Sequence, residues 1–475
     1  MLRYLQFFIS IACFLACSSK QPVQDETIDS TTANTAVTVQ PVKDSFVTGK
    51  VITPITCKND GSQSYALYIP VAQNNAPMPV VYCFDPHGDG ALPLQNYQAL
   101  ADAYHFILIG SNNSKNDNDW NTAQNIWNTL FNDTQSRLLF NNNRIYTCGF
   151  SGGAKVAGFI AMHQSNIKGV IAAGAGLPED QPVGNLPFTF TGMAGRGDMN
   201  MTDLVALNSA LDKTGTTHRL ILFNGKHAWP PANIMRVAFQ GLQLDAMRSK
   251  MIDKNDSLIK AFTVEMNQQI DKAIAAKKLI EAQQACALSI NMLNGLTDAT
   301  NAFANKEKAI TSSPLYQQQL QAAQQLFATE QKQKQIFQQQ FQQGDIHYWT
   351  ATINDLNVKA KASTAAGAMY QRLLAYLSLA FYSISNQLIH NNQNEPAQYF
   401  VTLYKMADPT NSEVWYFSAV LNARNNNPEA AEADLLKAVE NGFNDTTRML
   451  QQPEFQTLSP QLNFTLIESR MKRVK

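Results

Sequence analysis

Short apolar runs of β-type residues recur along the first half of the chain, with stretches of helical spacing between them. This alternation is typical of the α/β class, in which helices cover a mainly parallel sheet. The first two runs flank Asn-Asp-Gly at residues 59–61 and predict an opening hairpin. Eight strands are expected in all, over residues 49–56, 64–70, 79–85, 106–110, 144–150, 167–173, 188–193 and 218–223.

The second half of the chain has a different pattern. From about Pro231 onward the β-type runs stop, and apolar residues recur at helical spacing, as at Leu258, Phe262 and Met266. This spacing predicts an all-helical half. The glutamine-rich stretch over 316–343 is predicted to be helical rather than disordered, because apolar anchors recur in it, at Leu320, Leu326, Phe327, Phe337 and Phe341.

Near the C-terminus an internal repeat has a spacing of 34 residues. Together with Pro409, it resembles the tetratricopeptide repeat over about residues 370–443, and helices between 256 and 361 are expected to continue the array in degenerate form. Such an array offers either a concave surface for a protein partner or a structural buttress. The repeated large, small, small and large positions are Phe381 with Trp415, Ser385 with Ala419, Ala397 with Ala431, and Val401 with Leu435.

The N-terminus predicts export. Arg3 supplies a positive charge, and residues 5–15 form an apolar run shorter than the ~20 residues that a membrane span needs. The run ends in Phe-Leu-Ala-Cys, which resembles a bacterial lipoprotein signal and implies lipidation of Cys17 and a membrane anchor in the periplasm or at the cell surface. An ordinary cleaved signal is the alternative. Residues 18–45 lack a periodic pattern and are expected to be a flexible tether.

The pattern G-x-S-x-G occurs at residues 149–153. A β-type run precedes it and a helical run follows it, so the pattern lies at a strand-to-helix turn, as a nucleophile elbow requires. A serine on so tight a turn needs neighbours without side chains, and the turn lifts its hydroxyl above the sheet at a helix N-terminus. Ser151 is therefore the candidate nucleophile, and a purely structural turn is the alternative.

A serine nucleophile needs a base beside it and a carboxylate that orients the base. His227 follows the last predicted strand, where a loop can place an imidazole over the elbow. Asp198 follows the penultimate strand, with Asp203 as the substitute acid. The chain order Ser, Asp, His is that of α/β-hydrolases.

Three segments extend this likeness: Arg-Ile-Tyr at 144–146, Gly-Arg-Gly-Asp at 195–198 and Gly-Lys-His-Ala-Trp-Pro at 225–230. They resemble secreted esterases of the α/β-hydrolase superfamily that are related to polyhydroxybutyrate depolymerases and feruloyl esterases. The resemblance covers roughly residues 64–229. It implies that Ser151 is the nucleophile, that Asp198 is the orienting acid, and that His227 is the general base and then the acid.

Acyl transfer also needs two backbone N–H donors for the oxyanion. Gly152 follows the nucleophile and supplies the first. The second is expected in the turn at residues 85–90, from the amide of Asp89 or Gly88, while His87 shapes the turn.

Several side chains are candidates for the substrate pocket. Trp229 and Asn113 are the substrate-binding candidates, and Trp120, Asn112 and Asn116 could also face the pocket. Each has a structural alternative, since aromatic residues more often pack and asparagine-rich loops are commonly turns.

Composition limits the function classes. Lys plus Arg and Asp plus Glu both number 37, so no broad field exists to recruit nucleic acid. After Cys13 and Cys17, four widely spaced cysteines remain, at 57, 83, 148 and 286. They form neither a disulfide scaffold nor a CxxC metal site, and the expected chemistry needs no metal and no cofactor.

At 475 residues the chain exceeds one hydrophobic core. We expect a signal at 1–17, a tether at 18–45, an α/β-hydrolase catalytic domain at 46–250 and a helical, tetratricopeptide-like domain at 251–475. The predicted function is hydrolysis of an exposed polar or oligomeric carboxylic ester, because the short connection between Ala173 and Phe188 leaves no room for a bulky lid. A serine peptidase on the same fold and a non-catalytic binding lipoprotein are the alternatives.

Overall fold

The computed structural model describes residues 43–71, 76–116, 118–179, 181, 183–459 and 461–474. The predicted signal, Cys17 and nearly all of the predicted tether lie outside the described residues and stay predictions. No helix of the described part is long and apolar enough to cross a membrane.

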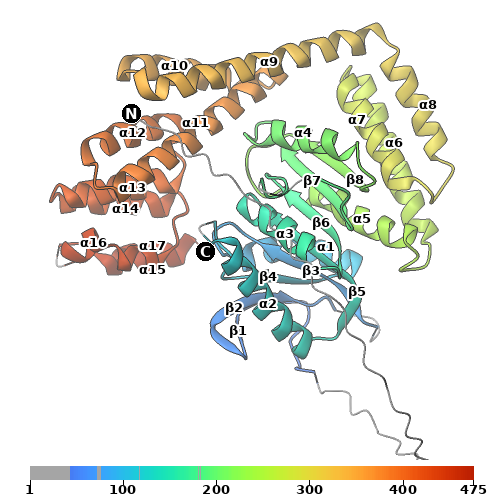
Figure 1. The fold of residues 1–475 in the computed structure, drawn as a ribbon, viewed down its shortest axis with the longest axis horizontal. Coiled ribbons are helices and arrows are strands. Elements are labelled where there is room, and N and C mark those ends of the chain that lie inside the picture. The colour runs from blue at the N-terminus through green and yellow to red at the C-terminus, as the bar shows by residue number, and fades with distance from the viewer. Residues whose placement is uncertain are drawn as a thin grey trace, which may run out of the picture. The chain divides into compact units, whose positions relative to one another are not determined.

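One eight-stranded sheet is the centre of the first half, as predicted (Figure 1). Its strand order is β1-β2-β4-β3-β5-β6-β7-β8. The sheet is mixed: β2 pairs antiparallel with β1 and β4, and the strands from β4 to β8 pair in parallel. The strands are β1 (Ile52–Cys57), β2 (Asp60–Tyr68), β3 (Met78–Phe84), β4 (Ile107–Ser111), β5 (Phe140–Phe150), β6 (Ile167–Ala173), β7 (Thr189–Gly195) and β8 (His218–Phe223).

Helices cover both faces of this sheet (Figure 1). Along β3, Val80 and Tyr82 pack against α2 and α3, whereas Val81 and Cys83 pack against α1 and α5. Successive side chains of a strand point to opposite faces, so a strand covered on both sides must be apolar at nearly every position. The helices are α1 (Ala91–Tyr104), α2 (Trp120–Arg137), α3 (Gly152–His163), α4 (Met201–Leu211) and α5 (Ala232–Arg248).

Two predicted boundaries are wrong. The opening hairpin turns one residue earlier than expected, because Cys57 pairs with Asp60 and the turn falls on Lys58 and Asn59. Strand β5 begins at Phe140, where it pairs with Met78, although residues 141–143 are all asparagine. Register shifts accompany both departures, and an apolar pattern carries no signal for such irregularities.

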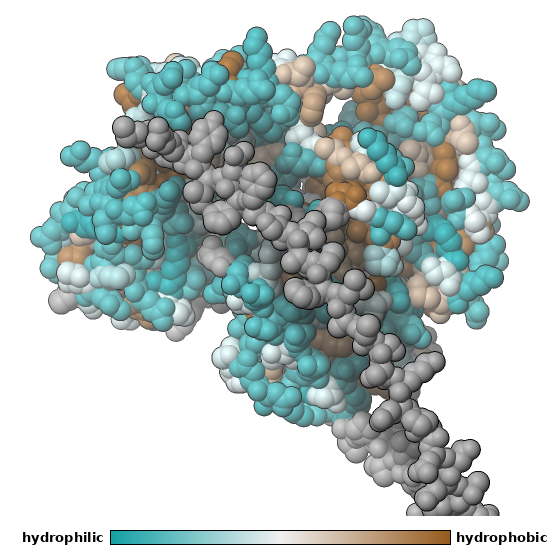
Figure 2. All heavy atoms as spheres, in the orientation of Figure 1, coloured by the Kyte–Doolittle hydropathy of each residue, from teal (hydrophilic) through white to brown (hydrophobic). Residues whose placement is uncertain are grey.

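After α5 the described chain is helical, as expected. One buried core joins the end of α5 to α6, α7 and α8, and a second joins α9 to the helices that follow it. Hydrophilic side chains cover most of the visible outer surface over α9 and α10 (Figure 2). These helices are α6 (Asp256–Ala275), α7 (Leu279–Leu293), α8 (Thr300–Thr311), α9 (Pro314–Gln343), α10 (Ile346–Lys359), α11 (Ala365–His390), α12 (Asn394–Ala407), α13 (Ser412–Arg424), α14 (Pro428–Glu440), α15 (Thr446–Gln451), α16 (Pro453–Thr457) and α17 (Phe464–Val474).

The predicted repeat falls on two helix hairpins, α11 with α12 and α13 with α14. Seven of its eight positions are buried, and Trp415 is partly buried. The identification as a tetratricopeptide array stays a prediction. In the glutamine-rich helix α9, Phe337 is buried, but Phe327 is 49% exposed and is no anchor.

Candidate functional site

Ser151 lies in a strained backbone between β5 and α3. Its φ is 52° and its ψ is −123°, a conformation that few residues with a side chain adopt. Its N–H donates to the carbonyl of Ala173 at 2.8 Å, which ties the turn to the end of β6. The serine is therefore held at the carboxyl edge of the sheet, at the first turn of a helix.

Gly153 shows why the elbow needs residues without side chains. A Cβ added there would lie 2.0 Å from the carbonyl oxygen of Phe84, at the end of β3.

We expect Gly153→Ala to lower the free energy of unfolding by about 1–3 kcal/mol, the usual cost of overpacking. Chemical denaturation measures this. Gly61→Ala is the matched control, because a Cβ at Gly61 meets nothing within 4 Å; equal losses in both variants would contradict the packing argument.

The three predicted triad residues meet at this edge. His227 Nε2 lies 3.0 Å from Ser151 Oγ, and His227 Nδ1 lies 2.9 Å from Asp198 Oδ1. Asp198 is buried, with 1% of its surface exposed, whereas the His227 side chain is 20% exposed. In this arrangement Nδ1–H donates to the carboxylate, which leaves Nε2 free to accept the serine proton.

The loop that carries Asp198, residues 195–200, is fixed by its own hydrogen bonds. The N–H of Asn200 donates to Asp198 Oδ1 at 2.9 Å, and Asn200 Nδ2 donates to the carbonyl of Gly174 at 2.7 Å. Asp203, the substitute acid, is an exposed residue in the first turn of α4. Asp198 therefore occupies the place of the orienting acid.

Trp229 connects the histidine loop to the turn after β3. Its Nε1 donates to Asp85 Oδ2 at 2.8 Å, and its ring packs 5.7 Å from Phe150 and 5.9 Å from Tyr97. The ring is partly buried and its only donor is bonded to Asp85, so the structure shows packing contacts for Trp229, and its role in substrate binding stays a prediction. Burial works to raise the pKa of Asp85, but hydrogen bonds from His87 and Trp229 outweigh it and lower that pKa.

His87 is exposed, as expected of a residue that shapes the turn. Its backbone N–H donates to Asp85 Oδ1 at 2.8 Å. The hydrogen bond to Asp85 raises the pKa of the His87 imidazole, and the charge of Asp85 adds to the rise.

Of the two predicted oxyanion donors, Gly152 directly follows Ser151, and Asp89 lies in the turn between β3 and α1. Gly152 begins α3, where an N–H has no acceptor within the helix. Asp89 Oδ1 accepts the N–H groups of Ala91 and Leu92, both at 3.2 Å, so its carboxylate caps α1. The Asp89 carboxylate is therefore held by the start of α1, and the role of its amide as an oxyanion donor stays a prediction.

Asn116 lies against the elbow. A Cβ added to Gly152 would lie 1.8 Å from Asn116 Oδ1, so the carboxamide of Asn116 is in contact with the backbone of Gly152. The sequence placed Asn116 among several pocket candidates without distinguishing it. The atom that faces Gly152 is the acceptor oxygen Oδ1, and only Nδ2 of the carboxamide can donate to an oxyanion, so the contact places Asn116 beside the elbow without showing a donor there.

The other candidates have structural roles. Asn113 uses both ends of its carboxamide on β2: Oδ1 accepts the N–H of Ser64 at 2.8 Å, and Nδ2 donates to the carbonyl of Ser62 at 3.1 Å. It is therefore not free to bind substrate. Asn112 Oδ1 accepts the N–H of Gly90, and Trp120 stacks on Phe159 at 4.8 Å. The cysteines at 57, 83, 148 and 286 are buried free thiols.

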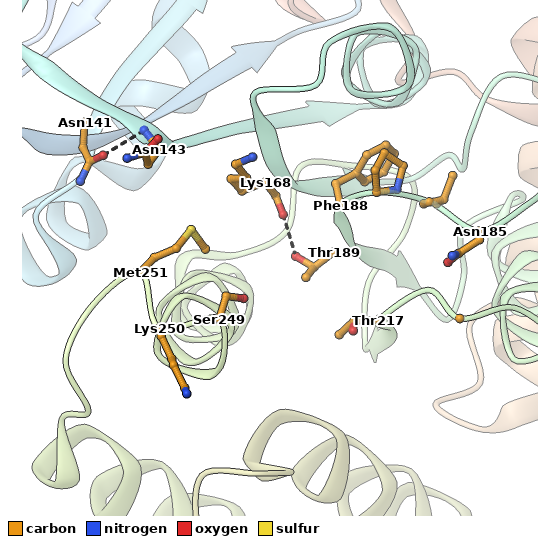
Figure 3. A pocket seen from close by; sticks show the side chains of 13 residues that line it. Asn141, Asn143, Lys168, Asn185, Phe188, Thr189, Thr217, Ser249, Lys250 and Met251 are labelled. Atoms are coloured by element: carbon orange, nitrogen blue, oxygen red, sulfur yellow. Dashed lines mark hydrogen bonds between the residues drawn. The ribbon is translucent and has the colours of Figure 1, made fainter.

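A polar pocket of about 790 Å³ lies at the opposite edge of the sheet (Figure 3). Its lining includes Lys168 and Thr189 near the starts of β6 and β7, and Ser249 to Met251 after α5. Lys168 and Thr189 are joined through the Lys168 carbonyl. None of the triad residues lines this pocket, so it does not belong to the candidate active site.

The eight-stranded sheet, the elbow between β5 and α3 and the order Ser, Asp, His together define an α/β-hydrolase fold. Part of this chain aligns with solved structures of other proteins. A ferulic acid esterase aligns with a TM-score of 0.32 and 15% identity, over 41% of this chain and 97% of its own. The feruloyl esterase module from Clostridium thermocellum complexed with sinapinate aligns with a TM-score of 0.31 and 12% identity, over 40% and 84%.

The acylaminoacyl peptidase of Pyrococcus horikoshii aligns with a TM-score of 0.30 and 10% identity, over 39% of each chain. No protein-family model and no curated protein matches the sequence.

Proposed function

We propose that the protein is a serine hydrolase that cleaves a carboxylic ester. The observation that carries the proposal is the contact of three side chains in series, with Nε2 of His227 at 3.0 Å from Ser151 Oγ and Nδ1 at 2.9 Å from Asp198 Oδ1. A buried carboxylate, an imidazole and a hydroxyl in this order activate a serine that is otherwise a poor nucleophile at neutral pH.

The reaction follows from these positions. Ser151 Oγ attacks the ester carbonyl while its proton moves to His227 Nε2, and Asp198 stabilises the resulting imidazolium. The tetrahedral oxyanion is held by the amides of Gly152 and Asp89. Collapse breaks the bond to the alcohol, which leaves with the proton from Nε2. Water, deprotonated by His227, then attacks the acyl-enzyme and releases the acid and the free serine.

Asn116 is proposed as an additional oxyanion donor through its side-chain amide. We expect Asn116→Asp to lower kcat on a short ester by about 100-fold, because this near-isosteric change removes the donor and places a carboxyl beside the developing charge. Steady-state kinetics measures the change. Asn118→Asp is a control from the same loop, since Asn118 accepts the N–H of Lys115; an equal effect of both variants would assign the loss to the loop.

The substrate class is proposed from one connection. Between the end of β6 and the start of β7, the described residues contain no helix or strand that could form a lid. A site without a lid from this connection suits polar or oligomeric esters better than long-chain lipids, which need an apolar enclosure. We expect short p-nitrophenyl esters to be hydrolysed at least 10-fold faster, by kcat/KM, than emulsified long-chain triglyceride. Preference for the triglyceride would overturn this assignment of substrate class.

A further inference from the structure

The loop that carries Asp198 is held by helices from the second half of the chain. Arg372 on α11 donates from Nη1 to the carbonyl oxygen of Arg196 at 2.5 Å. The side chain of Arg196 donates from Nη2 to Gln284 Oε1 on α7 at 2.9 Å. Two helices of the second half therefore hold residue 196, which precedes Asp198 by two positions.

Arg372 is itself fixed in place. Its Nε and Nη2 donate to Glu330 Oε2 on α9 at 2.9 and 2.6 Å. Glu330 is fully buried, and Lys334 Nζ lies 3.1 Å from its other oxygen. A buried carboxylate is stable only when it is paired, so Glu330 holds the guanidinium of Arg372 in place. Because the guanidinium is planar and rigid, its third nitrogen, Nη1, then points at the acid loop.

The opposite side of the same loop contacts the segment that leads to His227. The N–H of Arg196 donates to the carbonyl of Phe223 at 2.7 Å, and the N–H of Gly197 donates to that of Gly225 at 2.8 Å. A Cβ added to Gly197 would lie 2.4 Å from Gln371 Oε1 on α11. The acid loop is thus packed between the histidine segment and α11, with no space for another atom.

We propose that Arg372 is a positioning residue of the triad, so that the helical half forms part of the hydrolase's working site. By holding the carbonyl of residue 196, Arg372 fixes Asp198 and, through its Oδ1, the imidazole of His227. The effect reaches catalysis because a misplacement of about 1 Å, caused far from the chemistry, can cost about 100-fold in rate. This inference rests on the proposed hydrolase function.

The test compares four variants of the full chain on a short p-nitrophenyl ester, with kcat and KM measured on the folded fraction. Arg372→Met should lower kcat by about 10- to 100-fold, the order of loss expected when a catalytic group is misplaced, and should leave KM within twofold of the parent. Arg372→Lys should lose less, because an ammonium keeps the charge pair with Glu330 but lacks the fork. The double variant R372M/E330Q should regain thermal stability over R372M without regaining kcat, since it also removes the buried carboxylate that R372M leaves without its guanidinium.

Arg424→Met is the matched control. Arg424 pairs with Glu454 at 2.8 Å, and both side chains are largely buried in the helical half. Its loss should lower the melting temperature and leave kcat within twofold of the parent. A native kcat in R372M overturns the positioning role, and if R372M does not fold, a native kcat in the double variant does so. An equal loss of kcat in R424M overturns it as well. A parent chain that neither turns over esters nor reacts with a fluorophosphonate overturns the proposed function instead.

Discussion

Replacing Ser151 with alanine is expected to reduce kcat on a carboxylic ester by about a million-fold. The rate that remains should be ~1,000-fold above the uncatalysed rate. The expectation follows from the position of Ser151 Oγ, which lies 3.0 Å from His227 Nε2. The strained backbone of Ser151, with φ 52°, holds the hydroxyl in that position. What remains comes from substrate binding and the oxyanion donors, which the substitution leaves intact. Steady-state kinetics with a short p-nitrophenyl ester measures the loss.

The double variant S151A/H227A controls for independent effects. Serine and histidine act as one unit, so removing both should cost about as much as removing either one. Losses that add up in the double variant would mean that the two residues contribute separately. Far-UV circular dichroism of each variant establishes that the fold is retained.

Asp198→Asn is expected to lower kcat by about 10,000-fold, the size of the effect when a triad carboxylate is replaced by its amide. The substitution keeps the shape, and Oδ1 can still accept the N–H of Asn200 at 2.9 Å. It removes the charge that stabilises the imidazolium, and the amide can hold His227 in the wrong tautomer. Asp203→Asn, five residues after Asp198 in the first turn of α4, should stay within twofold of the parent.

Kinetics of both variants decide between the two acids. A large loss in D203N together with a small loss in D198N would move the role of orienting acid to Asp203. The structure favours Asp198, which is buried against the imidazole, whereas Asp203 is exposed. The histidine contact at 2.9 Å belongs to Asp198.

The sequence was sufficient to predict the sheet and the meeting of the three triad residues. Parallel strands end at the same edge, so residues placed directly after β5, β7 and β8 must approach one another there. Ser151, Asp198 and His227 each follow one of these strands. Helix α9 was also predictable in spite of its glutamines, although its anchor at Phe327 was not correct.

Other features depend on contacts that no local pattern encodes. Arg372 and Arg196 are 176 residues apart, and nothing in either segment indicates the other. The carboxamides of Asn113 and Asn116 differ in role because one faces β2 and the other faces Gly152, while their sequence surroundings are alike. The sequence indicated that Trp229 belongs to the histidine loop, but it could not predict that the indole N–H donates to Asp85.

Covalent labelling with a fluorophosphonate, followed by mass spectrometry of the labelled peptide, tests the central claim most directly. The native chain is predicted to gain one adduct, on Ser151, at a rate that falls with D198N, and S151A is predicted to gain none. Equal labelling of the native chain and S151A, or an adduct on a different serine, would contradict the assignment of Ser151 as an activated nucleophile.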